Sequence, residues 1–203
     1  MKLEISSAMV KELRDKTGTG MMDCKEALIA ASGDFEKAID ILRKKGLSAA
    51  TKRSSKAAKD GTIVSYIHMG GKIGVMVEIN CETDFVAKTE DFQKMAKDVA
   101  MHIAASNPLY LRPEDIPENT LEREKEIYRS QLREENKPEK IWDKIIEGKL
   151  NKFYEDVCLT HQKFIKDTDI NIETFVNNLI AKTGENIIIR RFERFQLGEE
   201  TKK

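Results

Sequence analysis

Two β-strand patterns joined by a pair of glycines constrain the fold of this chain more than any other feature. Residues 62–69 are rich in β-branched and aromatic side chains, and Gly70-Gly71 follows them. From Ile73 to Asn80, apolar side chains alternate with other residues. Two such runs around a Gly-Gly turn are typical of an antiparallel β-hairpin, and a strand with one apolar face lies on a core. We therefore expect a hairpin over residues 61–80 that packs on a core.

The rest of the chain predicts one more strand among several helices. Residues 186–197 carry three consecutive isoleucines at 187–189, and this β-branched start favours a strand that pairs antiparallel with the hairpin. Helical spacing of apolar residues predicts further helices, at about 90–106, within 118–158 and at 172–182. Within residues 118–158 we expect three helices, with Gly148 closing the second. The expected fold class is α+β, with a three-stranded antiparallel sheet packed with helices.

Residues 1–46 predict a compact unit of three short helices. Polar residues suited to cap each helix precede the apolar runs, namely Ser6 or Ser7, Asp23 and Asp34. Glycines suited to end each helix follow the runs, namely Gly18, Gly33 and Gly46. Caps and stops in this order favour a helix–turn–helix–turn–helix unit.

Residues 47–60 form a basic segment between this unit and the hairpin. Four cations lie there among alanines and serines, and together with residues 43–45 they make a run with no acid until Asp60. The run is either a solvated linker or loose helix, or a contact for an acidic or phosphate-bearing partner. The sequence thus predicts three parts: a helical domain at 1–46, a basic linker at 47–60 and a core domain at 61–203.

The composition excludes several classes of function. Among 203 residues, 40% are hydrophobic and 34% are charged, and Lys plus Arg equals Asp plus Glu, so the net charge favours neither nucleic acid nor membrane. Cys24, Cys81 and Cys158 lie far apart without a Cys-x-x-Cys pair, and the three histidines are scattered. We expect no disulfide framework, no metal and no cofactor. Without an apolar stretch long enough to cross a bilayer, the chain is expected to be cytoplasmic.

The connection from Asn80 to Ala87 is unusually apolar for a loop. Phe85 and Val86 follow Asp84 there, and they either fold back under the sheet or point outward toward a pocket on a partner. Cys81 with Asp84 and His102 would be the best thiol-catalysis set in the chain. No feature of the sequence lowers the thiol pKa, so we do not expect an enzyme.

Met21 and Met22 are a second pair with two interpretations. Methionine is a flexible apolar side chain that fills gaps in cores and also lines adaptable contact surfaces. The pair follows Thr17-Gly18-Thr19-Gly20, which lacks the Lys-Ser/Thr of a phosphate loop and is better explained as a turn between helices.

Four separated motifs, in order, closely resemble elongation factor Ts. They are residues 10–14 (VKELR), 17–28 (TGTGMMDCKEAL), 80–88 (NCETDFVAK) and the tail from Gly184 to Phe192. That family is the guanine nucleotide exchange factor for elongation factor Tu in protein biosynthesis. The resemblance implies an N-terminal domain like ubiquitin-associated domains and a core domain that grips the GTPase.

The resemblance also implies which residues bind elongation factor Tu. A first set would enter near the switch region and dislodge magnesium, with Phe85 as an apolar wedge: Thr83, Asp84, Phe85 and Val86. A second set would dock on the nucleotide-binding domain: Arg14, Met21 and Met22. The alternative is a ubiquitin-associated-type adaptor in which residues 1–46 do the main binding.

The chain is similar to the short form of the family. It has room for one three-stranded module, where longer members carry two related modules and a helical hairpin. The resemblance implies that two copies pair, and because the final strand has no cysteine, we expect a noncovalent homodimer. The expected partners are GDP-bound and nucleotide-free elongation factor Tu, without direct binding to nucleic acid or membrane.

Overall fold

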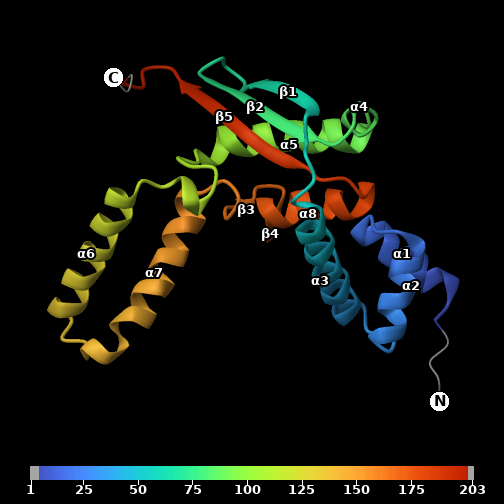
Figure 1. Ribbon diagram of the computed structural model, residues 1–203, viewed down its shortest axis with the longest axis horizontal. Coiled ribbons are helices and arrows are strands. Elements are labelled where there is room, and N and C mark those ends of the chain that lie inside the picture. Colours follow the sequence, from blue (N-terminus) through green and yellow to red (C-terminus); the bar gives the residue numbers. More distant parts are fainter. Residues whose placement is uncertain (1–4, 201–203) are drawn as a thin grey trace. The chain divides into compact units, whose positions relative to one another are not determined.

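The computed structural model describes residues 5–200 (Figure 1). The chain falls into two compact units. Each unit is assembled from three separate stretches of the chain. The first unit takes residues up to Val64, then Glu78–Lys97 and Thr174–Arg190. The second takes Ser65–Val77, Asp98–Glu173 and the residues from Arg191 onward.

The predicted three-stranded antiparallel sheet is confirmed. Its order is β1 (Asp60–Ile67), β2 (Ile73–Cys81) and β5 (Ile188–Gln196). At the hairpin turn, His68 N donates to Ile73 O at 2.9 Å, and beyond the end of β5, Leu197 N donates to Lys72 O at 2.8 Å. Alternate residues of β2 are buried and face the core, as the apolar alternation predicted.

Helices α1 (Ser7–Thr17), α2 (Met21–Ala30) and α3 (Phe35–Arg53) form the N-terminal helical region. They enclose a small core of apolar side chains: Val10, Leu13, Cys24, Ala27, Leu28, Ala31, Ala38 and Leu42. The caps at Ser6 and Asp34 are confirmed. The cap at Asp23 is wrong, because α2 already begins at Met21 after Gly20, and the Asp23 carboxylate instead pairs with Lys45 at 2.6 Å.

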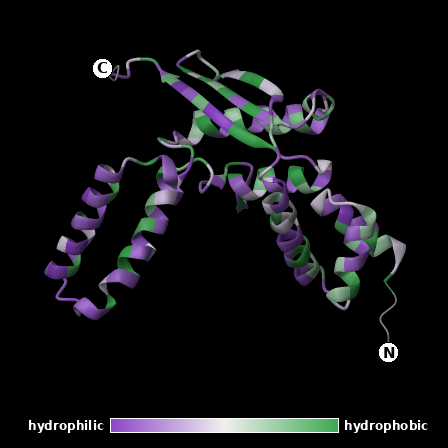
Figure 2. Cartoon of the chain, in the orientation of Figure 1, coloured by the Kyte–Doolittle hydropathy of each residue, from purple (hydrophilic) through white to green (hydrophobic). Residues whose placement is uncertain are grey.

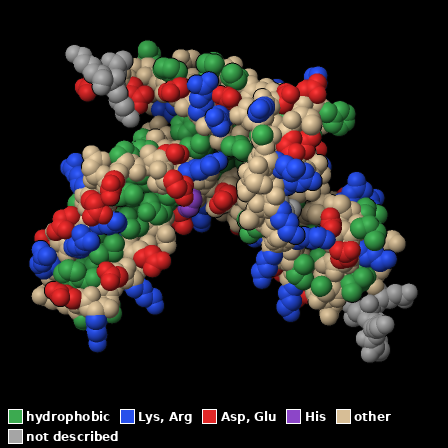
Figure 3. Space-filling view, viewed as in Figure 1, with side chains coloured by type: hydrophobic (Ala, Val, Ile, Leu, Met, Phe, Trp, Pro, Cys, Tyr) green, Lys and Arg blue, Asp and Glu red, His purple; other side chains and the backbone are tan. Residues whose placement is uncertain are grey.

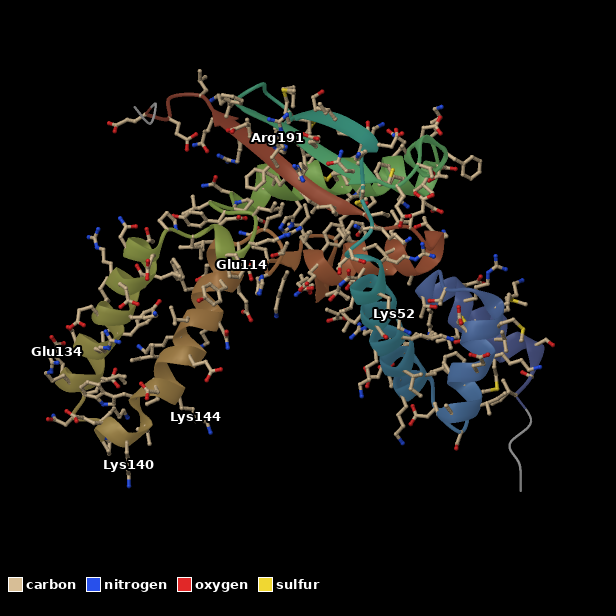
Figure 4. The ribbon with its side chains drawn as sticks, in the orientation of Figure 1. Lys52, Glu114, Glu134, Lys140, Lys144 and Arg191 are labelled. Carbon is tan, nitrogen blue, oxygen red and sulfur yellow. The ribbon has the colours of Figure 1, made fainter. Side chains whose placement is uncertain are left out.

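The prediction that the third helix ends at Gly46 is also wrong. Helix α3 continues to Arg53 and takes in half of the basic segment, including Lys52 (Figure 4). An isolated glycine costs a helix only about 1 kcal/mol relative to alanine. The good helix formers that follow Gly46, together with its burial, outweigh that cost. The division into parts at 1–46, 47–60 and 61–203 stays a prediction.

Two helices and a single helical turn accompany the sheet. The turn α4 (Asp84–Ala87) follows β2, and α5 (Glu90–Ser106) follows α4. Thr89 caps α5, since its hydroxyl accepts from Phe92 N at 3.3 Å. Helix α8 (Ile172–Thr183) precedes β5. The most buried side chains of α5 fall on one stripe that includes Phe92, Val99 and Ile103.

Helices α6 (Glu118–Glu134) and α7 (Trp142–Val157) run side by side as a helical hairpin (Figure 1). The prediction of a separate helix after Gly148 is wrong, because α7 passes through this residue without a break. A helical hairpin is thus present in this chain, although the resemblance assigned one only to longer members of the family. Polar residues cover much of both helices (Figure 2), and hydrophobic side chains show between charges of both signs (Figure 3).

Short elements complete the second unit. They are the 3-10 turns η1 (Pro113–Asp115) and η2 (Glu139–Ile141) and the antiparallel pair β3 (Lys163–Phe164) and β4 (Asp167–Asn171). Over the part of the chain that the structure describes, no helix combines the length and apolarity needed to cross a membrane.

Candidate partner-binding site

The segment after β2 folds into a single helical turn, α4. Thr83 is its N-cap residue, with an extended backbone and a hydroxyl that accepts from Val86 N at 3.3 Å. At the other end, the Thr89 hydroxyl donates to Val86 O at 2.7 Å. The Thr83 hydroxyl thus satisfies a backbone N–H at the start of the turn. The Thr89 hydroxyl adds a second donor at Val86 O, which also accepts from Thr89 N at 3.0 Å.

The apolar pair in this turn is divided between the core and the surface. Val86 is 6% exposed, whereas the side chain of Phe85 is 77% exposed. Successive residues of a helix point about 100° apart, so a single turn can bury one side chain and expose its neighbour. Val86 packs inward and Phe85 extends outward, so the two interpretations of the pair each hold for one residue. Val86 offers a partner little surface of its own and serves to hold the turn.

Asp84 places a charge beside the exposed ring. Lys88 Nζ lies 2.6 Å from Asp84 Oδ2. The hydrogen bond from Lys88 lowers the pKa of Asp84, so this carboxylate is ionised at neutral pH. Both side chains are mostly exposed, and water screens their pairing. The negative charge of Asp84 therefore remains available to a cationic group of a partner that competes with Lys88.

Two glutamates fasten this segment to the connection between α8 and β5. Glu185 accepts from Thr83 N at 3.0 Å and from Thr83 Oγ1 at 2.7 Å. In the opposite direction, Glu82 Oε1 accepts from Asn186 N at 2.7 Å. Residues 184–192 carry part of the resemblance, but the sequence does not predict this contact, because partners 102 residues apart leave no local pattern.

The basic segment also reaches this place. Arg53 Nη1, at the end of α3, lies 3.6 Å from Glu82 Oε1, and the side chain of Asn186 donates to Lys56 O at 2.7 Å. Both contacts lie within the first unit. Arg53 and Lys56 therefore tie the basic segment to the residues around α4.

The geometry does not support thiol catalysis at Cys81. Its side chain is fully buried and donates to Thr83 O at 3.1 Å. Burial, helped by the nearby charge of Glu185, raises the pKa of the thiol to about 11. A thiol with that pKa is almost entirely protonated at neutral pH and is a poor nucleophile. His102 hydrogen-bonds with Gln162 at 3.0 Å instead.

The second predicted set lies on the surface of the helical region. Met21 and Met22 are 48% and 67% exposed on the first turn of α2, and Arg14 is exposed on α1. The two methionines are therefore not core filler. Ile29, which the sequence analysis did not single out, is a further exposed apolar residue of α2. The sequence does not predict this exposure, because in a short and largely apolar helix the helical spacing does not show which apolar residues face the core.

Comparison with known proteins gives a consistent result over nearly the whole chain. A family profile described as "Elongation factor TS" matches residues 4–199. The chain is 80% identical over 199 residues to elongation factor Ts of Syntrophus aciditrophicus, covering 98% of this chain and 99% of that protein. It is 58% identical over 195 residues to elongation factor Ts of Desulfosudis oleivorans, covering 96% and 98% of the two chains. With elongation factor Ts of Geotalea daltonii the identity is 58% over 201 residues, covering 99% and 93%.

Proposed function

The chain belongs to the elongation factor Ts family, and from that membership we propose that it is a guanine nucleotide exchange factor for elongation factor Tu in translation elongation. It binds the GDP-bound GTPase, promotes the release of GDP and stabilises the nucleotide-free form. The observation that carries this proposal is the outward position of Phe85 on a firmly anchored turn.

Phe85 acts as the wedge. A large apolar side chain in water gains free energy when it enters a pocket, about 1.5–3 kcal/mol for a phenylalanine. If the pocket opens only when GDP and magnesium leave, that energy favours the nucleotide-free state alone. At about 1.4 kcal/mol per tenfold change, one side chain accounts for a ten- to hundredfold weakening of GDP binding.

No bond chemistry is required of this chain. The effect of each ligand on the other is reciprocal, so a factor that binds the nucleotide-free GTPase more tightly must weaken GDP by the same factor. Asp84 contributes a negative charge close to the magnesium and phosphate site, where the metal ion is the largest local charge. Thr83 and Val86 hold the turn in place for these two side chains.

The helical region provides the second contact. Arg14, Met21 and Met22 dock on the nucleotide-binding domain of the GTPase, and the exposed methionines suit an adaptable apolar contact. We assign residues 1–46 to a ubiquitin-associated-like docking domain, 47–60 to a linker and 61–203 to the core domain. The factor works in the cytoplasm, without a cofactor, and as a noncovalent homodimer.

GDP release from elongation factor Tu tests the role of Phe85. Elongation factor Tu loaded with fluorescent GDP is mixed with the parent chain or with Phe85→Ala. Loss of the wedge should slow the stimulated release by about ten- to hundredfold. The circular dichroism spectrum should stay native, because the side chain is mostly exposed.

Leu109→Ala is the matched control, since Leu109 is also an exposed apolar residue but lies outside both proposed contact sets. It should release GDP at the parent rate, and a Phe85→Ala variant as active as this control refutes the wedge.

A ubiquitin-associated-type adaptor remains the second candidate, favoured by the exposed apolar residues of α2. For an adaptor, Met22→Asp abolishes all binding to the partner and Phe85→Ala has no effect. For an exchange factor, Met22→Asp weakens the complex while the core contact at Phe85 persists. The same release measurement, repeated over a range of factor concentrations, distinguishes these outcomes.

A further inference from the structure

Two carboxylates and two backbone N–H groups form a reciprocal bridge at the base of α4. Glu185 accepts from Thr83 N, and Glu82 accepts from Asn186 N. Each of the two segments, 82–83 and 185–186, thus supplies one carboxylate acceptor and one N–H donor to the other. We propose that Glu185 is a positioning residue for nucleotide exchange, which acts through Thr83 to hold Phe85 in its outward position. This inference rests on the proposed function.

The hydroxyl of Thr83 transmits the effect of Glu185. A hydroxyl has one proton to donate and two lone pairs to accept with. Thr83 Oγ1 donates to Glu185 Oε1 at 2.7 Å, so the proton of the hydroxyl points to this carboxylate group. The lone pairs of the hydroxyl are then free to accept from Val86 N at 3.3 Å. Glu185 thereby orients the cap on which the turn depends.

The turn needs this support because it is very short. Helix α4 has four residues, and a helical segment of that length is not stable by itself in water. Its other anchors include the buried side chains of Val86 and Ala87. The Thr89 hydroxyl also donates to Val86 O at 2.7 Å, and the Gln93 side chain donates to Ala87 O at 2.7 Å. Without the cap, the backbone around Asp84 and Phe85 would sample other conformations. Each binding event would then have to order the segment again, at a cost in free energy.

The hydrogen bonds of Asn186 hold the neighbouring Glu185 in place. Asn186 is 3% exposed, and its backbone N–H and its side-chain amide are both engaged, with Glu82 and with Lys56 O. Glu185 is the residue before this fixed point and is itself half-buried. The carboxylate is therefore held against Thr83 by a neighbour that cannot easily move, which is what accurate positioning requires.

The decisive variant is Glu185→Ala, studied in the full chain. The maximal rate of stimulated GDP release should fall by about three- to tenfold, the size expected when hydrogen bonds to a partly solvated carboxylate are lost. The concentration of factor that gives half of the maximal rate should change little, because the docking residues are intact. Amide hydrogen exchange should accelerate at Thr83 and Val86, with that of α5 unchanged.

Three further variants show whether Glu185 acts through the turn. Glu185→Gln keeps an acceptor and nearly the same volume, and should restore part of the rate. Adding Glu185→Ala to Phe85→Ala should lower the rate no further, since the wedge that Glu185 positions is already gone. Glu173→Ala removes an exposed carboxylate from α8, the helix that precedes Glu185, and should match the parent.

The outcomes separate the two proposals. If Phe85→Ala slows release but Glu185→Ala does not, positioning by Glu185 is refuted and the exchange function stands. If Phe85→Ala releases GDP at the parent rate, the wedge is refuted. In that case unchanged amide exchange at Thr83 and Val86 in Glu185→Ala would also refute the ordering role of Glu185, and faster exchange would support it.

Discussion

At the scale of single residues, His102 shows how burial dictates a protonation state. The ring is fully buried, with Nδ1 accepting from Ile165 N at 3.4 Å and Nε2 lying 3.0 Å from Gln162 Oε1. The amide group of Gln162 in turn donates to Asp156 O at 2.8 Å, which assigns its oxygen to His102. Only the neutral ring with its proton on Nε2 satisfies every partner, because a second N–H would face that of Ile165.

The chain should therefore lose stability in mild acid. Burial lowers the pKa of His102, although the hydrogen bond with Gln162 opposes the shift. Below the ordinary pKa of about 6.5, the unfolded chain binds a proton that the folded chain does not, so the free energy of unfolding falls as the pH falls. One histidine contributes at most about 1.4 kcal/mol per pH unit in this range. Urea midpoints at about pH 7.5 and pH 5.5 measure the loss.

A comparison of two variants assigns the acid sensitivity to this residue. His102→Gln removes the titrating group, and the drop in its urea midpoint should be smaller than that of the parent. His68→Gln replaces an exposed histidine and should show the full drop. Equal drops in all three chains would contradict the assignment.

At the scale of elements, Gly46 lies inside α3 and Gly148 lies inside α7. The sequence pattern had predicted that a helix ends at each of these glycines. A Cβ at Gly46 would meet Ala181 Cβ at 3.8 Å, which is ordinary contact, and a Cβ at Gly148 would meet nothing within 4 Å. Neither position requires glycine for space. Each glycine therefore only weakens the local preference of the backbone for the helical conformation.

Alanine at either position should stabilise the chain. Replacing a glycine inside a helix restricts the unfolded chain, and each of Gly46→Ala and Gly148→Ala should raise the free energy of unfolding by about 0.5–1 kcal/mol. Gly18→Ala is the contrasting control, because Gly18 ends α1 with a φ of 67°, where a side chain is strained. It should lower stability. Chemical denaturation followed by circular dichroism measures all three, and a loss of stability in both helical variants would contradict the prediction.

At the scale of the whole molecule, one end of the sheet exposes apolar side chains that suit pairing with a second copy. Within the second unit, the residues around the hairpin turn and the end of β5 include five exposed large apolar side chains: Ile67, Met69, Met76, Phe195 and Leu197. Met69 is 90% exposed. Such a group on a soluble chain is a candidate interface. The three cysteines are buried and unpaired, so none is placed to link two copies.

The chain should therefore sediment as a dimer, with or without a reducing agent. Ile67→Glu places a charge on the apolar group and should shift the population toward monomer, because burial of an unpaired charge is unfavourable. Ile29→Glu makes the same kind of change on α2 and should leave the mass unchanged. Analytical ultracentrifugation over a range of concentrations gives the masses, and a parent chain that remains monomeric throughout would refute the dimer.

Local patterns in the sequence determined the elements and the surface they present. The alternation from Ile73 to Asn80 and the Gly-Gly turn predicted the hairpin, and Ser6 and Asp34 marked helix starts. These signals act over a few residues, because side-chain periodicity and capping involve only near neighbours along the chain. The family motifs likewise located the segment that carries Phe85 before any contact was known.

Tertiary structure alone decided how that segment is held and which of its side chains is exposed. Whether Phe85 or Val86 points outward depends on the rotation of a single turn, and that rotation depends on partners far away in the sequence. Glu185 meets Thr83 only because the connection after α8 lies beside the end of β2. In the same way, α3 continues past Gly46 because surrounding contacts outweigh a small local preference. The sequence located the segment that carries Phe85, and long-range hydrogen bonds hold the turn that exposes this side chain.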